Sequence, residues 1–146
     1  MEIYSGALDV TKIYASWYER YKDKNCGAFI TFAGIVRDED GIDGLSFDIH
    51  KPLLKSWLDG WQERLKKIDG YALLAHSKGD VLIHECSYVA AIITPRRAAG
   101  LKLFAEFVED FKQNAPIWKY DIIEKKRVYA KQRSHKLPNA GILSDD

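Results

Sequence analysis

The stretch Gly27–Val36, GAFITFAGIV, decides the fold more than any other part of the sequence. It contains no charged residue, and its phenylalanine, isoleucine, threonine and valine residues favour extended backbone. A strand that is apolar at successive positions, instead of every second one, buries both of its faces. The stretch therefore predicts a central strand that is covered on both sides by other elements.

The segments on either side of this run predict alternating strands and helices. Ile3–Ser5 predicts a short strand, and Asp9–Lys22 predicts a helix with apolar residues at four-residue spacing. After a turn-rich loop, Leu45–Ile49 alternates apolar and polar residues, which is typical of a half-exposed strand. Pro52 then opens a helix with one apolar stripe, made by Leu54, Trp57, Leu58, Trp61, Leu65 and Ile68.

The next part of the chain predicts two further strands, Tyr71–His76 and Val81–Thr94, on either side of a turn at Ser77–Asp80. Thr94 is expected to cap a third helix, and Pro95 is expected to begin it.

The third helix is expected to run to about Asn114, because Pro116 stops it. Ile117–Tyr129 then predicts one or two final strands. Strands outnumber helices and several strands follow one another directly. The expected fold class is therefore α+β, with about three helices and a mostly antiparallel sheet.

Length and composition limit the kind of protein this can be. The chain has 146 residues, of which 47% are hydrophobic, and a net charge of +1, so residues 1–135 are expected to form one folded domain. Residues 136–146 are expected to be a flexible tail. The longest uncharged stretch, Asn25–Val36, is too short to span a membrane. With no signal-peptide layout at residues 1–5 and only two cysteines, the sequence predicts a soluble cytoplasmic protein with reduced thiols.

Positive charge is concentrated near the end of the chain. Lys112–Lys136 carries a net charge of +6, which leaves −5 for the rest. Such a segment attracts an anion, which can be a nucleic acid, a phosphorylated small molecule or an acidic protein surface. The alternative is a basic surface that only faces solvent.

Lys112 is the residue in this segment that most suggests chemistry. A helical projection places Lys112 and Arg97 near an apolar face formed by Leu101, Phe104, Ala105, Val108 and Phe111. A lysine on a buried face must reach water, a carboxylate or a bound anion. Burial would also lower its pKa and make it usable as a base or a nucleophile. The alternative is a lysine whose head reaches solvent at the end of the helix.

Four other cations are candidates for binding an anion. Arg96 and Arg97 lie at the start of the third helix, where backbone N–H groups are free. Arg37 ends the apolar strand and begins a glycine-containing loop, and Lys119 follows Lys112 by seven residues. Solvated arginines and lysines are the alternative at each of these positions.

Metal and nucleotide motifs are missing from the sequence. The four histidines show no HxxxH or HExxH spacing, the two cysteines form no CxxC pair, and no glycine-rich phosphate loop occurs. The sequence therefore predicts neither a metal site nor a cofactor.

With these residues in view, the sequence resembles the catalytic (large) subunit of molybdopterin synthase, the MoaE family. The likeness runs from about residue 3 to residue 130 and is carried by Gly27–Arg37, His76–Val81 and Lys112–Lys119. Its most specific part is the spacing of Arg97, Lys112, Pro116, Trp118 and Lys119. The resemblance implies an α/β hammerhead fold.

The resemblance also implies a sulfurtransferase activity and its partners. Sulfur would pass from the thiocarboxylated C-terminal Gly-Gly of a small ubiquitin-like (MoaD-like) subunit to cyclic pyranopterin monophosphate, forming the dithiolene of molybdopterin. The large subunit would form a central dimer within a heterotetramer, with no nucleic acid or membrane involved.

By position, Lys112 and Lys119 match the family's catalytic and tail-channel lysines. Arg37 matches the arginine of the pterin-phosphate pocket, and Arg97 matches the one that reaches an anion site across the dimer. Arg96 replaces the family's usual histidine, so it can bind an anion but cannot transfer a proton near neutral pH. Ser77 replaces an arginine that often follows His76.

Two other functions use the same basic segment. A non-catalytic module would hold a ubiquitin-like tail without forming product. A small nucleic-acid-binding protein would use Lys119–Lys136 with Tyr120 and Tyr129, and its affinity would fall steeply with salt.

Overall fold

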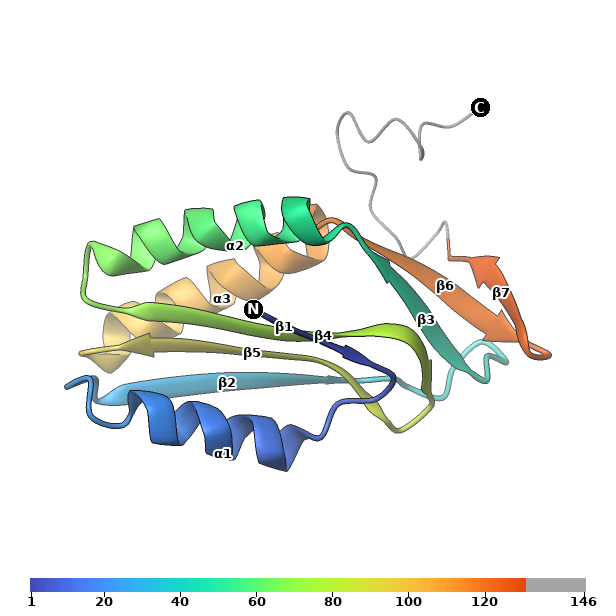
Figure 1. Cartoon of the computed structure of the whole chain (residues 1–146), viewed down its shortest axis with the longest axis horizontal. Coiled ribbons are helices and arrows are strands. Elements are labelled where there is room, and N and C mark those ends of the chain that lie inside the picture. Colours follow the sequence, from blue (N-terminus) through green and yellow to red (C-terminus); the bar gives the residue numbers. More distant parts are fainter. Residues whose placement is uncertain (131–146) are drawn as a thin grey trace.

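The computed structural model describes residues 1–130, and the counts of elements below refer to that range. Seven strands and three helices follow one another along the chain (Figure 1). The elements are β1 (Glu2–Ser5), α1 (Val10–Tyr21), β2 (Ala28–Ile35), β3 (Gly44–Ile49), α2 (Lys51–Lys66), β4 (Tyr71–Leu82), β5 (Cys86–Thr94), α3 (Arg97–Asn114), β6 (Ile117–Ile123) and β7 (Lys126–Tyr129).

The strands form one open sheet in the order β2-β5-β4-β3-β6-β7, and β1 pairs with β4. The β1–β4 pairing is parallel, whereas the five other pairings are antiparallel. The predicted α+β class, with three helices and a mostly antiparallel sheet, is confirmed. The predicted tail at residues 136–146 and the last residues of the predicted domain lie outside the described residues.

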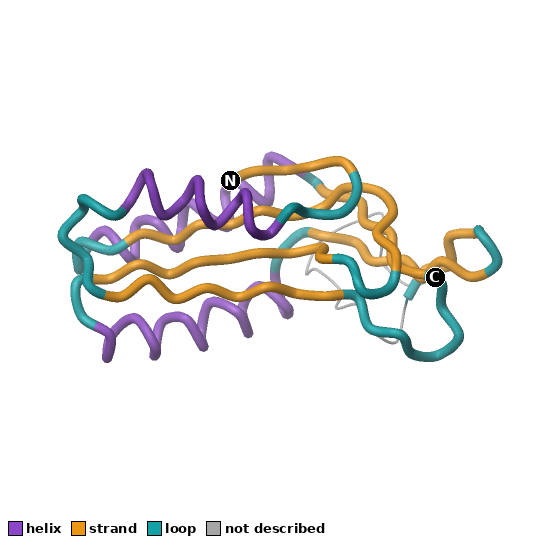
Figure 2. The backbone as a smooth tube through the Cα atoms, turned by 90° about the horizontal axis from the view of Figure 1, so that it is seen from below, coloured by secondary structure: helices purple, strands orange, loops and turns teal. Residues whose placement is uncertain are grey.

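Helices cover both faces of the sheet, as the view from below shows (Figure 2). Alternation along β4 and β5 decides which side chain meets which helix. One face packs against α2 and α3 and is formed by Ala72, Leu74, Tyr88, Ala90 and Ile92. The opposite face packs against Ile13 and Trp17 of α1 and is formed by Leu73, Ala75, Val89, Ala91 and Ile93.

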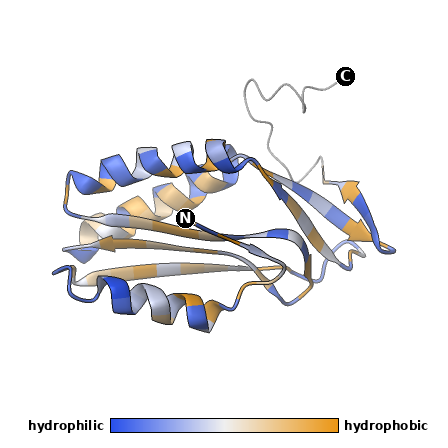
Figure 3. Cartoon of the chain, viewed as in Figure 1, coloured by the Kyte–Doolittle hydropathy of each residue, from blue (hydrophilic) through white to orange (hydrophobic). Residues whose placement is uncertain are grey.

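The prediction that Gly27–Val36 would be a central strand is wrong, although side chains of β2 pack on both faces, Phe32 on one and Phe29 and Ala33 on the other. All nine residues of β5 are buried, whereas β2 lies at the edge of the described sheet and is largely half-exposed. Both strands are rich in apolar residues (Figure 3). An apolar run shows that a strand has covered faces, but it does not show whether both edges are paired.

The predicted turn at Ser77–Asp80 is also wrong, because β4 continues through it. Tyr71–His76 pairs with β5, and Gly79–Leu82 pairs with β3, so β4 passes from one half of the sheet to the other. Gly79 has a φ of +81°, a conformation that glycine adopts without strain, and it lies where the pairing changes. The chain reverses instead between Leu82 and Cys86.

The third helix begins two residues later than predicted. Arg97 is its first residue and Arg96 its N-cap, so Pro95 precedes the helix. Thr94 is the last residue of β5, where it pairs with Ala28, and its hydroxyl donates to the Arg96 carbonyl at 2.7 Å. Thr94 is therefore held in the sheet by strand pairing, although the local sequence favours it as the N-cap of the helix.

The buried face of α3 is rotated from the predicted one. Gly100 and Phe107 are buried, and Leu103, Phe104, Val108 and Phe111 pack against the core. Leu101 is 56% exposed and Ala105 is also exposed. The apolar residues of α3 extend around more than half of the helix, so their periodicity alone does not fix its orientation.

Candidate active site

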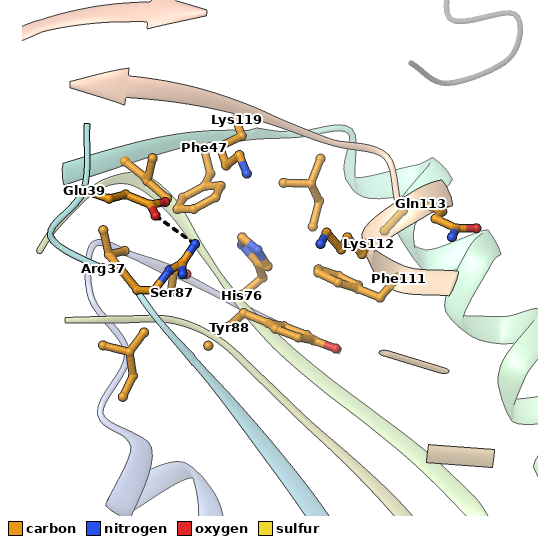
Figure 4. Close-up of a pocket in the computed structure, with 16 residues that line it drawn as sticks. Arg37, Glu39, Phe47, His76, Ser87, Tyr88, Phe111, Lys112, Gln113 and Lys119 are labelled. Atoms are coloured by element: carbon orange, nitrogen blue, oxygen red, sulfur yellow. Dashed lines mark ion pairs between the residues drawn. The ribbon is translucent and has the colours of Figure 1, made fainter. Parts of the chain in front are cut away.

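A cavity of about 280 Å³ opens where the two halves of the sheet meet. Its walls come from the end of β2 and the loop after it, from β3, β4, β5 and β6, and from the last turn of α3. Three cations surround the space above His76 from different sides, and they are Arg37, Lys112 and Lys119 (Figure 4).

Lys112 lies in the last turn of α3. A cation is favoured there because the carbonyl end of a helix carries partial negative charge. The side chain lines the cavity but is exposed to solvent, so the prediction that Lys112 lies on the buried face of the helix is wrong. Its position supports an electrostatic role toward an anion. It does not support the role of base or nucleophile that burial of the lysine would have favoured.

Arg37 stands two residues after the end of β2, at the rim of the cavity. Its guanidinium forms an ion pair with Glu39 at 2.8 Å, and its side chain is 78% exposed. Because the pair is exposed to solvent, it is worth little, so an incoming anion can compete with Glu39 for the guanidinium.

Lys119 is half-buried on β6, directly opposite Phe47 of β3 in the ladder. Strand pairing therefore fixes its backbone, while α3 fixes that of Lys112. The lysines are seven residues apart in sequence and line one cavity from two elements.

Arg96 and Arg97 lie away from this cavity. They are exposed at the first turn of α3, whereas Lys112 is in its last turn. A helix rises 1.5 Å per residue, so about 22 Å separates Arg97 from Lys112 along the axis. The role predicted for the two arginines needs a second copy of the chain and stays a prediction. Lys131, Arg133 and Lys136 of the basic segment lie outside the described residues.

The floor of the cavity is aromatic, and sequence reasoning missed it. His76 contacts three rings, with centroid distances of 4.9 Å to Phe47, 5.7 Å to Phe111 and 5.9 Å to Tyr88. The rings of Tyr88 and Phe111 stack in parallel at 4.0 Å. The signal in the sequence was weak: His76 shares one strand face with Ala72 and Leu74, both core residues.

His76 is the one histidine of residues 1–130 that is buried, with 3% of its surface exposed. Burial disfavours the charged imidazolium and lowers the pKa of His76 to about 4. The Nδ1 atom lies 2.8 Å from the Ser77 carbonyl oxygen. A carbonyl oxygen can only accept a hydrogen bond, so Nδ1 carries the proton and donates it.

Residues 1–130 contain neither a cluster of metal-binding side chains nor a membrane-spanning helix. No group of three or more histidine, cysteine, aspartate or glutamate side chains in this range is placed to hold a metal ion. Within the same range, no helix is long and apolar enough to cross a membrane.

Comparison with known proteins gives consistent matches. The family model described as MoaE protein matches residues 4–114. A relative from Helicobacter pylori (strain ATCC 700392 / 26695), called molybdopterin synthase catalytic subunit, is 47% identical over 144 residues, which is 99% of each chain.

Solved structures share the fold. A chain in a complex of subunits 1 and 2 of molybdopterin-converting factor from Helicobacter pylori 26695 has a TM-score of 0.91 and 48% identity, and the match covers 98% of each chain. A chain of molybdopterin synthase from Staphylococcus aureus has a TM-score of 0.74 at 20% identity, covering 88% of this chain and 94% of that one.

Proposed function

Because this chain belongs to the MoaE family, we propose that it is the catalytic subunit of a molybdopterin synthase and acts as a sulfurtransferase. The sulfur donor is the thiocarboxylated C-terminus of a small ubiquitin-like subunit. The acceptor is cyclic pyranopterin monophosphate, and the product carries the molybdopterin dithiolene. The observation that carries this proposal is the convergence of Arg37, Lys112 and Lys119 on one cavity with an aromatic floor.

The charges of the cavity suit both substrates. A thiocarboxylate and a phosphate are anions, and a cation within hydrogen-bond reach binds either one more strongly than a neutral donor does. We assign Arg37 to the phosphate of the precursor, and Lys112 and Lys119 to the carrier's tail. Arg96 and Arg97 would bind the same phosphate from a second copy of the chain, in a dimer that places one carrier at each end.

The reaction needs a nucleophile, a stabilised anion and water. The thiocarboxylate sulfur attacks a side-chain carbon of the precursor and forms a carbon–sulfur bond while a carbon–oxygen bond of the same carbon breaks. The oxygen leaves as water or, where the cyclic phosphate opens, with the phosphate. Water then attacks the carrier's acyl carbon, which breaks its bond to sulfur and releases the carrier as a carboxylate. A second carrier supplies the second sulfur. Lys112 stabilises the oxyanion that develops on the acyl carbon during hydrolysis.

Single-turnover conversion of cyclic pyranopterin monophosphate by the chain with its thiocarboxylated carrier tests this function. We expect the wild type to form dithiolene. The rate of Lys112→Ala should be lower by about 100-fold or more, because removing one hydrogen-bond donor to an oxyanion slows a reaction by at least that factor. Lys66→Ala is the matched control, because Lys66 is also an exposed lysine in the last turn of a helix.

Each result has a distinct meaning. Full turnover by Lys112→Ala would remove the lysine from the mechanism. A wild type that binds the carrier but forms no product would be a non-catalytic module for a ubiquitin-like tail.

A further inference from the structure

The cavity presents two kinds of polar group in different places. Its rim carries the cationic donors Arg37, Lys112 and Lys119, and Glu39 is the carboxylate that lines it. Its floor carries the imidazole of His76, held among Phe47, Tyr88 and Phe111. A ligand that fills the cavity therefore meets cations at one end and aromatic rings with one imidazole at the other.

The imidazole is held in one tautomer and one orientation. Nδ1–H is committed to the Ser77 carbonyl, so Nε2 of the neutral ring has a lone pair and no proton. Phe47 meets the ring at 80°, edge to face, while Tyr88 and Phe111 lie at 34° and 32° to it. These contacts restrict rotation, so Nε2 is a pre-positioned hydrogen-bond acceptor.

A hydrogen-bond acceptor at this position favours one orientation of a bound ligand over the reverse one. A phosphate or a thiocarboxylate presents lone pairs, which a lone pair on Nε2 repels, and both are attracted to the rim. A heterocyclic N–H or amino group presents a hydrogen, which Nε2 accepts. Burial keeps the ring neutral at physiological pH, so the floor does not become a fourth cation.

We propose that His76 Nε2 accepts a hydrogen bond from the N–H edge of the pterin ring and so orients the precursor with its phosphate toward Arg37. This inference rests on the proposed function and adds a residue that contacts the substrate. The rings of the floor give a bicyclic heterocycle apolar and aromatic surface to pack against.

Two substitutions distinguish the effect of the acceptor Nε2 from that of the hydrogen bond between Nδ1 and the Ser77 carbonyl. His76→Gln can place an amide oxygen near the position of Nε2. His76→Asn places an amide N–H near the position of Nδ1, and its shorter side chain leaves no acceptor at the position of Nε2. Calorimetric titration of each variant, without carrier, uses cyclic pyranopterin monophosphate as one probe and inorganic phosphate as the other. Thermal unfolding of both variants checks that they are folded.

We expect His76→Gln to bind the precursor within about threefold of the wild type, and His76→Asn to bind it about tenfold more weakly, the value of one hydrogen bond in a buried site. Phosphate should bind all three proteins equally. Nitrogen NMR of the wild-type imidazole gives an independent reading, because the Nε2 resonance should shift upfield when the precursor is added.

Several results would overturn the inference. One is an Nε2 resonance that does not shift when the precursor is added. Another is precursor binding by His76→Asn that is as tight as that of His76→Gln. A third is a loss of phosphate binding by His76→Asn as large as its loss of precursor binding. A wild type that binds the precursor but forms no dithiolene contradicts the proposed function alone. A wild type that binds no precursor contradicts both.

Discussion

His76 makes the stability of the protein depend on pH. Its pKa is lowered from 6.5 to about 4 in the folded chain. Between these two pH values the imidazole is therefore protonated in the unfolded chain and neutral in the folded chain. The free energy of unfolding should therefore fall as the pH decreases from about 6.5 to about 4, by roughly 2–3 kcal/mol from this group.

Urea unfolding of the wild type and of His76→Gln at several pH values measures this contribution. Carboxylates add their own pH dependence to both proteins, so the quantity of interest is the difference between the two curves. Parallel curves from pH 6.5 to 4 would mean that His76 is not buried in neutral form.

Asp110 joins two helices through a single carboxylate. Its Oδ2 accepts from Nε1 of Trp57 at 2.9 Å and from Nε1 of Trp61 at 2.7 Å, and Oδ1 accepts from the Asn114 amide at 2.7 Å. Asp110→Ala leaves the indole N–H groups of the buried Trp61 and the half-buried Trp57 without this acceptor and should cost about 2 kcal/mol.

Asp59→Ala is the control for Asp110→Ala in denaturant unfolding. Asp59 forms an exposed i, i+4 pair with Lys55, which is worth less than about 0.5 kcal/mol. Equal losses from the two substitutions would show that the indoles find other acceptors.

At the scale of residues, the sequence predicted the cations of the site better than its floor. Arg37, Lys112 and Lys119 could be named as candidates from local features, the end of a strand and a basic segment, and all three line the cavity. The environment of His76 could not, because it depends on Phe47 from β3 and Phe111 from the end of α3. Those residues meet His76 only after the sheet and helix have packed.

Two helix glycines give opposite predictions at the scale of elements. A Cβ on Gly60 of α2 would meet nothing within 4 Å, so Gly60→Ala should stabilise the protein by about 0.5–1 kcal/mol through helix propensity. A Cβ on Gly100 of α3 would lie 2.5 Å from Thr94 Oγ1 and 3.0 Å from Ile30 Cδ1. Gly100→Ala should therefore destabilise it, by about 1–3 kcal/mol.

Thermal or urea unfolding of the two alanine variants tests this contrast directly, since each variant serves as the control of the other. The missing side chain at Gly100 lets α3 lie close to Thr94 of β5 and Ile30 of β2. A stable Gly100→Ala variant would show that α3 can move away from the sheet without loss.

The same elements show what periodicity can predict. The types of β2, β3, α1 and α2 followed from local pattern, because alternation and helical spacing reflect which faces are covered. The position of β2 at the edge, the course of β4 through Ser77–Asp80 and the rotation of α3 did not. Each depends on pairing or packing with a segment that is distant in sequence.

The molecule as a whole presents its cavity cations to solvent, and this predicts how carrier binding responds to salt. Raising sodium chloride from about 50 mM to about 500 mM should weaken binding of the carrier about tenfold or more, because exposed charges are screened. Lys112→Ala should reduce this dependence and Lys66→Ala should leave it unchanged. Calorimetric titration across the salt series measures it, and identical slopes in all three proteins would place the carrier elsewhere.

The continuity of β4 limits how this chain can change in length. Side chains alternate along a strand, so one residue inserted between His76 and Val81 would turn the fully buried Val81 to the opposite face or shift its pairing with Leu45. Residues 40–41, in the exposed part of the loop between β2 and β3, can gain or lose residues without changing either register. Variants of this chain that keep the cavity should therefore differ in length in such loops, and the number of residues from His76 to Val81 should stay the same.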